Sequence, residues 1–153
     1  MNALVKALNH HAVPVPDKAL DGTDYSKAVL MMTMMPGAFI GGSYLVDPDK
    51  ANDIDVVVSS SVWQLVAQTV LDAYGPSEMR FAERKEEYEG NPDVQEIHYF
   101  GRVNLIVATE EMIAAYKAAA REMKNNPELY PTRHDRIELH QHYKRQIRQW
   151  LGL

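Results

Sequence analysis

The chain has 153 residues, of which 46% are apolar and 24% charged, as is typical of one soluble globular domain. It contains no cysteine, so disulfides, thiolate catalysis and metal–thiolate sites are excluded. The net charge of −5 argues against non-specific coating of nucleic acid and leaves small molecules or proteins as partners.

Neither a membrane span nor a secretory signal is predicted. The longest apolar stretch, residues 28–32, is far shorter than the roughly 18 residues that a span requires. The first ten residues lack the basic start, the long apolar run and the cleavage site of a secretory signal. We therefore expect a cytoplasmic protein without membrane contacts, in which residues 1–153 form a single domain.

The first predicted elements are helices that flank a proline-rich loop. Residues 2–10 predict a short amphipathic helix, and residues 11–24 predict a loop because they contain two prolines and a glycine. Residues 25–35 are unbranched and rich in methionine, which favours a helix that ends at Pro36. Residues 38–41 form a short apolar run that ends in glycine and fits a buried strand.

The clearest predicted strand covers residues 53–58, which are β-branched and become fully apolar toward their end. Serines at positions 59–61 offer N-caps for a following helix. Apolar residues recur at helical spacing after them until Gly75 and Pro76 end the element.

The second half predicts two strands and two helices. Residues 83–93 are charged and predict an exposed loop, whereas residues 94–100 and 102–107 predict strands joined at a glycine. Thr109 is suited to cap a helix, and a last helix runs from about residue 133 to 150 with Trp150 or Leu151 facing the core. We therefore expect an α/β (α+β) domain with a small mixed sheet of about four strands, on which the helices from about residue 109 to 153 pack.

Asp53 and Asp55 carry the strongest chemical signal. Side chains two positions apart on a strand project to the same side, with Cα atoms roughly 6.6 Å apart. Both carboxylates can then bind one divalent cation, or a pair of cations about 3.5–4 Å apart. Mg²⁺ prefers one or two carboxylates together with water and phosphate oxygens. The alternative interpretation is a solvated pair of acids at a strand edge.

A glycine-rich turn precedes these aspartates. Gly41 and Gly42 lack Cβ atoms, so a phosphate can approach their backbone amides closely, and the Ser43 hydroxyl adds a donor. A triphosphate held between this turn and a metal ion would present its α-phosphorus for in-line attack. Taken alone, the turn also fits a plain connection between a strand and a loop.

The combination of these motifs resembles the signature of the polymerase-beta-type nucleotidyltransferase superfamily. A Gly-Ser pair after an apolar strand is followed by nine residues and then by Asp-apolar-Asp-apolar. Residues 38–58 look like the minimal members, such as small antibiotic nucleotidyltransferases and the nucleotidyltransferase partners of toxin–antitoxin pairs. In that family the glycine and serine contact nucleotide phosphates and the two acids bind Mg²⁺. These roles fall here on Gly42, Ser43, Asp53 and Asp55.

The resemblance implies a nucleotidyltransferase-like fold and transfer of a nucleoside monophosphate from a triphosphate to a hydroxyl acceptor. The family usually has a third carboxylate on a later strand, but the matching position carries Asn104. Asparagine can ligate a metal through its carbonyl oxygen but cannot act as a base at neutral pH. Glu96 on the preceding strand is a candidate substitute. The alternatives are weak activity or a catalytically silent module that binds nucleotide.

The last predicted helix carries excess positive charge within an acidic chain. This charge either complements the C-terminus of the helix or reaches a phosphate, for which Arg133 and Arg136 are the candidates. The acceptor is open: a small cationic molecule, a tRNA end or a protein hydroxyl. His140 and His142 point about 200° apart on a helix, so we interpret them as solvated rather than as joint metal ligands.

Overall fold

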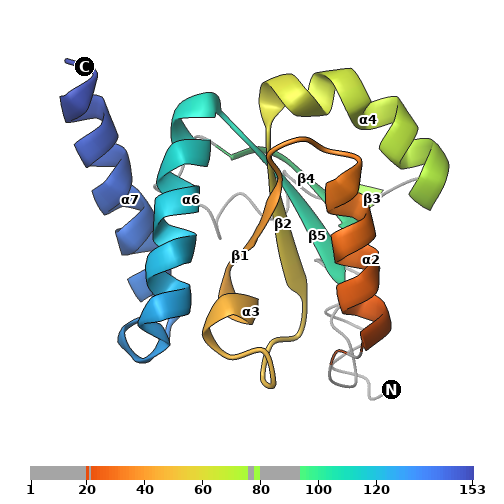
Figure 1. The fold of residues 1–153 in the computed structure, drawn as a ribbon, viewed down its shortest axis with the longest axis horizontal. Helices are drawn as coiled ribbons and strands as arrows, with labels where there is room; N and C mark the ends of the chain where they lie inside the picture. The colour runs from red at the N-terminus through yellow and green to blue at the C-terminus, as the bar shows by residue number, and fades with distance from the viewer. Residues whose placement is uncertain (1–19, 21, 76–77, 80–93) are drawn as a thin grey trace.

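The computed structural model describes residue 20 and residues 22–75, 78–79 and 94–153. In this part of the chain a mixed sheet lies between two layers of helices, which confirms the expected α/β fold class (Figure 1). The sheet has five strands, one of which has only two residues and was not expected. The predicted helix at residues 2–10 and the predicted loop at residues 83–93 lie outside the described residues.

The helices and strands follow the predicted order along the chain. Their bounds are α2 (Gly22–Thr33), β1 (Phe39–Gly41), α3 (Ser43–Val46), β2 (Ile54–Ser59), α4 (Ser60–Tyr74), β3 (Glu78–Met79), β4 (Val94–Phe100), β5 (Val103–Ala108), α6 (Glu110–Asn125), the 3₁₀ helix η2 (Pro127–Leu129) and α7 (Arg133–Trp150). Helix α2 begins three residues before the predicted helix, inside the segment that was expected to be a loop. Helix α3 and η2 were not expected.

The strand order in the sheet is β1-β2-β5-β4-β3. Strands β2 and β5 are parallel neighbours, and the other pairs are antiparallel. The register places Asp55 directly beside Asn104 in the β2–β5 pair and beside Gly41 in the β1–β2 pair. Three separate sequence segments therefore meet at one point of the sheet.

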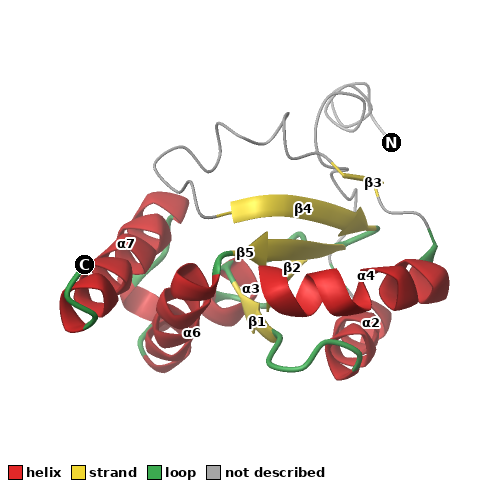
Figure 2. Ribbon diagram, turned by 90° about the horizontal axis from the view of Figure 1, so that it is seen from above, coloured by secondary structure: helices red, strands yellow, loops and turns green. Residues whose placement is uncertain are grey.

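Alternating side chains of the central strands form two separate cores. On one face, Val56, Val58 and Leu105 pack against α2 and α4. On the other face, Val57 and Ile106 pack against α6. Figure 2 shows α2 and α4 on one side of the sheet and α6 and α7 on the other. Each fully buried side chain of this size contributes roughly 1.5–3 kcal/mol of transfer free energy, so both faces stabilise the sheet.

Local hydrogen bonds fix where the long helices begin. The side chain of Ser59 accepts from the backbone N–H of Val62 at the start of α4, and Thr109 has the same role in α6. Thr132 and Asp135 form a reciprocal capping box at the start of α7. Each cap satisfies an amide that the helix itself leaves unpaired.

Helix α7 packs on α6 in its first and middle turns, where Leu139 meets α6 and Tyr143 and Ile147 join the core. The expectation that Trp150 or Leu151 faces the core is wrong, because these side chains are 94% and 64% exposed. Figure 1 shows the C-terminal end of α7 diverging from α6, which leaves the last turn without a packing surface. No helix in the described ranges is both long and apolar enough to cross a bilayer.

Candidate metal and phosphate site

The two aspartates of the predicted motif lie on the same side of the sheet, and Asn104 bridges them. Asn104 Nδ2 donates to Asp53 Oδ2 at 2.9 Å and to Asp55 Oδ1 at 3.1 Å. The two accepting oxygens are therefore no more than about 6 Å apart, within the span of one or two bridging divalent cations. The predicted proximity of the two carboxylates is present in the fold.

The glycine turn lies against the second of these acids. Gly42 has a φ of +71° and a ψ of −157°, a backbone conformation that is essentially restricted to glycine. A Cβ atom at this position would overlap the Asp55 carboxylate and lie 3.2 Å from its Cγ. The bend and the acid are thus in direct contact, and Gly42 is required for both its conformation and its lack of a side chain.

A cleft of about 680 Å³ opens beside these residues. Ser43, the first residue of α3, lines it together with Asp53. The first turn of α7 supplies Arg133 and Arg136 to its lining, and Lys50 lines it as well. The cleft therefore combines three carboxylates, of Asp47, Asp53 and Glu128, with three cationic side chains, so it offers ligands both for a metal ion and for a polyphosphate.

Arg136 interacts electrostatically with Asp55. Burial, followed by the neighbouring Arg133, lowers the pKa of Arg136, while Asp55 and Asp135 oppose that shift. Since a guanidinium stays protonated even with a lowered pKa, Arg136 remains a cation that interacts with Asp55 across the site. It also donates to the backbone oxygen of Tyr130 at 3.2 Å, which fixes its side chain.

A hydrogen-bond cluster fixes the wall that carries these arginines. The carboxylate of Glu122 in α6 accepts from the hydroxyls of Tyr130 and Tyr143, the latter at 3.2 Å. The bond to Glu122, together with burial and the charge of Glu122, raises the pKa of Tyr130 to about 12. The cluster connects α6, the segment after η2 and α7, so it positions the start of α7 relative to the sheet.

Glu96 lies away from the site, which corrects the prediction that it could replace the third carboxylate. In the β4–β5 pair it is beside Val107, three positions along β5 from Asn104. Its carboxylate is 3.7 Å from His98 Nε2. The His98 ring packs on Trp63 of α4, with ring centroids 4.8 Å apart. Glu96 therefore lies on the α2–α4 face of the sheet, opposite the aspartates.

The oxygen donors of the two aspartates fit Mg²⁺ better than a transition metal. Within the described ranges, no group of three or more His, Asp or Glu side chains could hold a metal ion. Asn104 is 3% exposed, and its Oδ1 is buried without a hydrogen-bond partner among the described residues. The carboxylates of Asp53 and Asp55 are hard ligands, and Mg²⁺ completes such a pair with water and phosphate oxygens. Asn104 turns its Nδ2, and not its Oδ1, toward them.

Two features of the cleft were not predicted from sequence. Pro127, Glu128 and Pro131 line it from η2 and the segment after it, and Lys50 lines it from the loop between α3 and β2. Neither position belongs to a motif with a defined spacing. Of the predicted residues, Ser43, Asp53, Arg133 and Arg136 line the cleft, while Gly41, Gly42, Asp55 and Asn104 support it from β1, β2 and β5.

Compared with protein-family models, with curated proteins and with solved structures, the chain matches none of them. The geometry of the residues described above is therefore the basis for any assignment of function.

Proposed function

We propose that the chain binds a nucleoside triphosphate with Mg²⁺ in this cleft and transfers the nucleotidyl group to a hydroxyl acceptor. The proposal is supported by one observation above all: Asp53 and Asp55 lie together, Asp55 lies against the Gly42 bend, and Asp53 lines one cleft with the arginines of α7. Carboxylates that attract a cation and arginines that attract an anion are found within one cleft. A metal–polyphosphate complex carries both charges.

Each group has a distinct role in the proposed reaction. Asp53 and Asp55 hold Mg²⁺, which when bound neutralises charge that develops on the phosphates. The backbone at Gly42, the Ser43 hydroxyl and the two arginines bind phosphate oxygens. The acceptor oxygen forms a bond to the α-phosphorus, the bond from the α-phosphorus to its bridging oxygen breaks, and pyrophosphate leaves. The acceptor proton passes to solvent, since Asn104 cannot accept it.

The direct test is a thermal-shift screen of the four nucleoside triphosphates with and without Mg²⁺. At 100 times the dissociation constant, a ligand adds about 2.7 kcal/mol to the free energy of unfolding. For a chain of this length this corresponds to a rise in Tm of about 5–11 °C. The double variant Asp53→Asn with Asp55→Asn should lose this rise.

The matched control for that variant is Asp72→Asn, on the exposed face of α4, which should respond to the triphosphate as the parent does. If the Asp53 and Asp55 double variant keeps the Mg²⁺-dependent rise, the cation does not bind at these carboxylates. If no triphosphate raises Tm in the presence of Mg²⁺, the proposal fails as a whole.

A catalytically silent nucleotide-binding module is the second candidate, and Asn104 is the observation that favours it. The side chain at the position of the family's third carboxylate is an amide that donates to both acids. Such a domain would bind the triphosphate without releasing pyrophosphate. A pyrophosphate-release assay with candidate acceptors separates the two functions, because the enzyme releases one pyrophosphate for each nucleotide transferred.

A further inference from the structure

A second concave surface lies at the free edge of the sheet. It is a groove of about 600 Å³ lined by Tyr25 and Met32 of α2, Phe39 and Ile40 of β1, and Tyr44 of α3. Figures 1 and 2 show β1 at the edge of the sheet between α2 on one side and α6 on the other. Among the described residues, none that lines this groove also lines the proposed nucleotide cleft.

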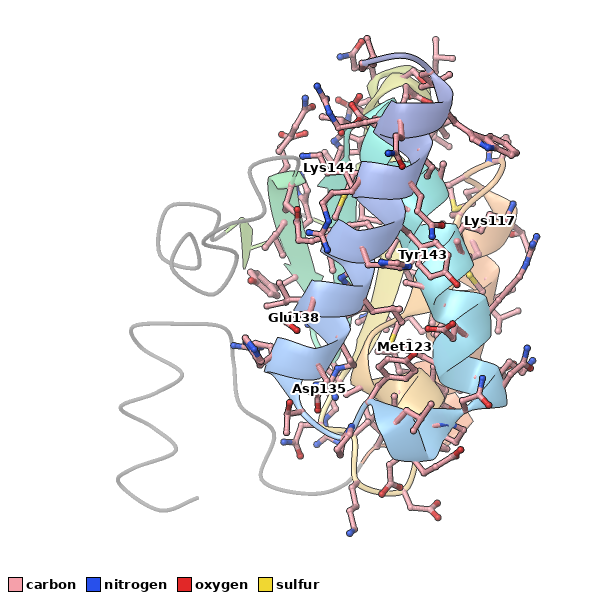
Figure 3. All side chains as sticks on the ribbon, turned by 90° about the vertical axis from the view of Figure 1, so that its left-hand side faces the viewer. Lys117, Met123, Asp135, Glu138, Tyr143 and Lys144 are labelled. Carbon is pink, nitrogen blue, oxygen red and sulfur yellow. The ribbon has the colours of Figure 1, made fainter. Side chains whose placement is uncertain are left out.

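One wall of this edge groove is cationic. Lys117, Arg121 and Lys124 of α6 line it, and their spacing of four and three residues places them on one exposed face of the helix. Figure 3 shows Lys117 on the side of α6 away from α7. No acidic side chain is among the described residues that line the groove, although the whole chain has a net charge of −5. The surface is therefore complementary to an acidic ligand.

The floor of the groove has backbone groups that can bind another strand. In the described sheet β1 pairs with β2 on one side only, so its other edge presents N–H and C=O groups. The three residues of β1 extend over about 10 Å, and the seven-residue separation of Lys117 and Lys124 on α6 also corresponds to about 10 Å. An extended peptide on β1 would therefore run beside the whole basic row.

We propose that this groove docks an extended acidic peptide of a partner protein, which adds a strand to the edge of β1. Backbone hydrogen bonds to β1 supply the register. Apolar side chains of the peptide contact Phe39 and Ile40, and its acidic side chains pair with Lys117, Arg121 and Lys124. The proposal does not depend on nucleotide binding, because the two surfaces share no described residue.

The free strand edge in the groove favours a peptide over single-stranded nucleic acid. Bases bind to open aromatic faces. In this groove Tyr25 and Tyr44 stack on each other, with ring centroids 6.1 Å apart and an angle of 23° between the planes. A nucleic acid would also leave the edge N–H and C=O groups of β1 without partners.

The test uses the full chain and a fluorescent peptide, Ac-Asp-Val-Glu-Ile-Asp-Val-Glu-NH₂, in which acids alternate with β-branched residues. Fluorescence anisotropy should show binding that weakens as ionic strength rises. The triple variant Lys117→Gln, Arg121→Gln and Lys124→Gln should weaken binding about tenfold or more. The control variant Lys144→Gln with Arg145→Gln removes charge from α7 and should bind as the parent does.

Two further probes complete the test. The same peptide N-methylated at every residue has no backbone N–H group to donate to β1 from either edge, so it should not bind. Equal binding of the two peptides, or no loss of binding in the triple glutamine variant, overturns the proposal. A thymidine oligonucleotide that binds more tightly than the acidic peptide would assign the groove to nucleic acid instead. Self-association that the triple variant abolishes would assign it to a second copy of this chain.

Discussion

Replacing Asn104 by aspartate would turn the bridge between two carboxylates into a third negative charge. Both hydrogen bonds from the amide would be lost, and the new carboxylate would lie about 3 Å from its two neighbours. Since Asn104 is 3% exposed, solvent screens this repulsion little. Leaving a buried charge uncompensated costs about 3–5 kcal/mol. In the absence of Mg²⁺ we expect N104D to lower Tm by roughly 6–20 °C at neutral pH.

The loss of stability should depend on pH and on Mg²⁺. Two neighbouring carboxylates hold the pKa of a third carboxyl above its unfolded value of about 3.9 in the folded state. The loss is therefore absent below about pH 4 and grows as the pH rises from there. A bound divalent cation compensates the added charge, so Mg²⁺ should raise the Tm of N104D more than that of the parent.

Thermal melts at pH 4 and pH 7, each with and without Mg²⁺, measure both effects. The control is Asn125→Asp, which adds the same charge at the exposed end of α6 and should change Tm little. The reasoning is refuted if N104D is as stable as the parent at pH 7 without Mg²⁺. It is also refuted if Mg²⁺ stabilises both proteins equally.

Four other substitutions test three separate parts of the structure. Gly37 has a φ of +82° and open space at the position of an added Cβ, so Gly37→Ala should lower the free energy of unfolding by about 1–3 kcal/mol. Gly42→Ala should lower it by about 1–3 kcal/mol more, because the added Cβ overlaps the Asp55 carboxylate. Equal losses for the two variants in chemical denaturation would contradict this contact. Glu122→Gln should lower the pKa of Tyr130 from about 12 toward 10 in an ultraviolet phenolate titration, and an unchanged value would show that Glu122 is not its cause. Burial lowers the pKa of His140 in the folded state to about 3, below its unfolded value. The neutral ring is therefore fully compatible with the fold above pH 6.5, and the unfolded state gains a proton as the pH falls below that value. The free energy of unfolding should decrease by about 2 kcal/mol on going from pH 7 to pH 5. His140→Leu should remove that decrease in denaturant titrations, and a parent and variant with the same pH dependence would show that His140 is not held neutral.

Elements with a local signal in the sequence were predicted closely, and those that depend on distant contacts were not. Helices α4, α6 and α7 begin within one or two residues of their expected starts, because capping side chains determine these boundaries. Strand β3 and helix α3 have two and four residues, too few to show a periodic pattern. Contacts with the rest of the fold, and not a pattern in their own sequence, determine where these two short elements form.

The same distinction applies to the candidate site. Asp53 and Asp55 project to the same side of the sheet because side chains alternate between the two faces along one strand. This could be predicted from the sequence alone. Whether Asn104 reaches them depends on the register of β5 on β2, and whether Glu96 reaches them depends on the register of β4 on β5; no local pattern determines either register. His140 was expected to be solvated, but it is 7% exposed because α7 turns it toward Tyr116 of α6, with ring centroids 4.1 Å apart. This correction required the contact between two helices.

The parallel pairing of β2 with β5 has a consequence for synthesis on the ribosome. Strand β2 can pair along its whole length with its parallel neighbour β5 only after residue 108 has been translated. The two arginines of the cleft are translated later still, the second of them at position 136. A nascent chain stalled before α7 would contain the acids and the glycine bend but lack the cations opposite them. If the proposed binding of triphosphate is correct, affinity should therefore appear late during translation, in a single step, as the last helix docks.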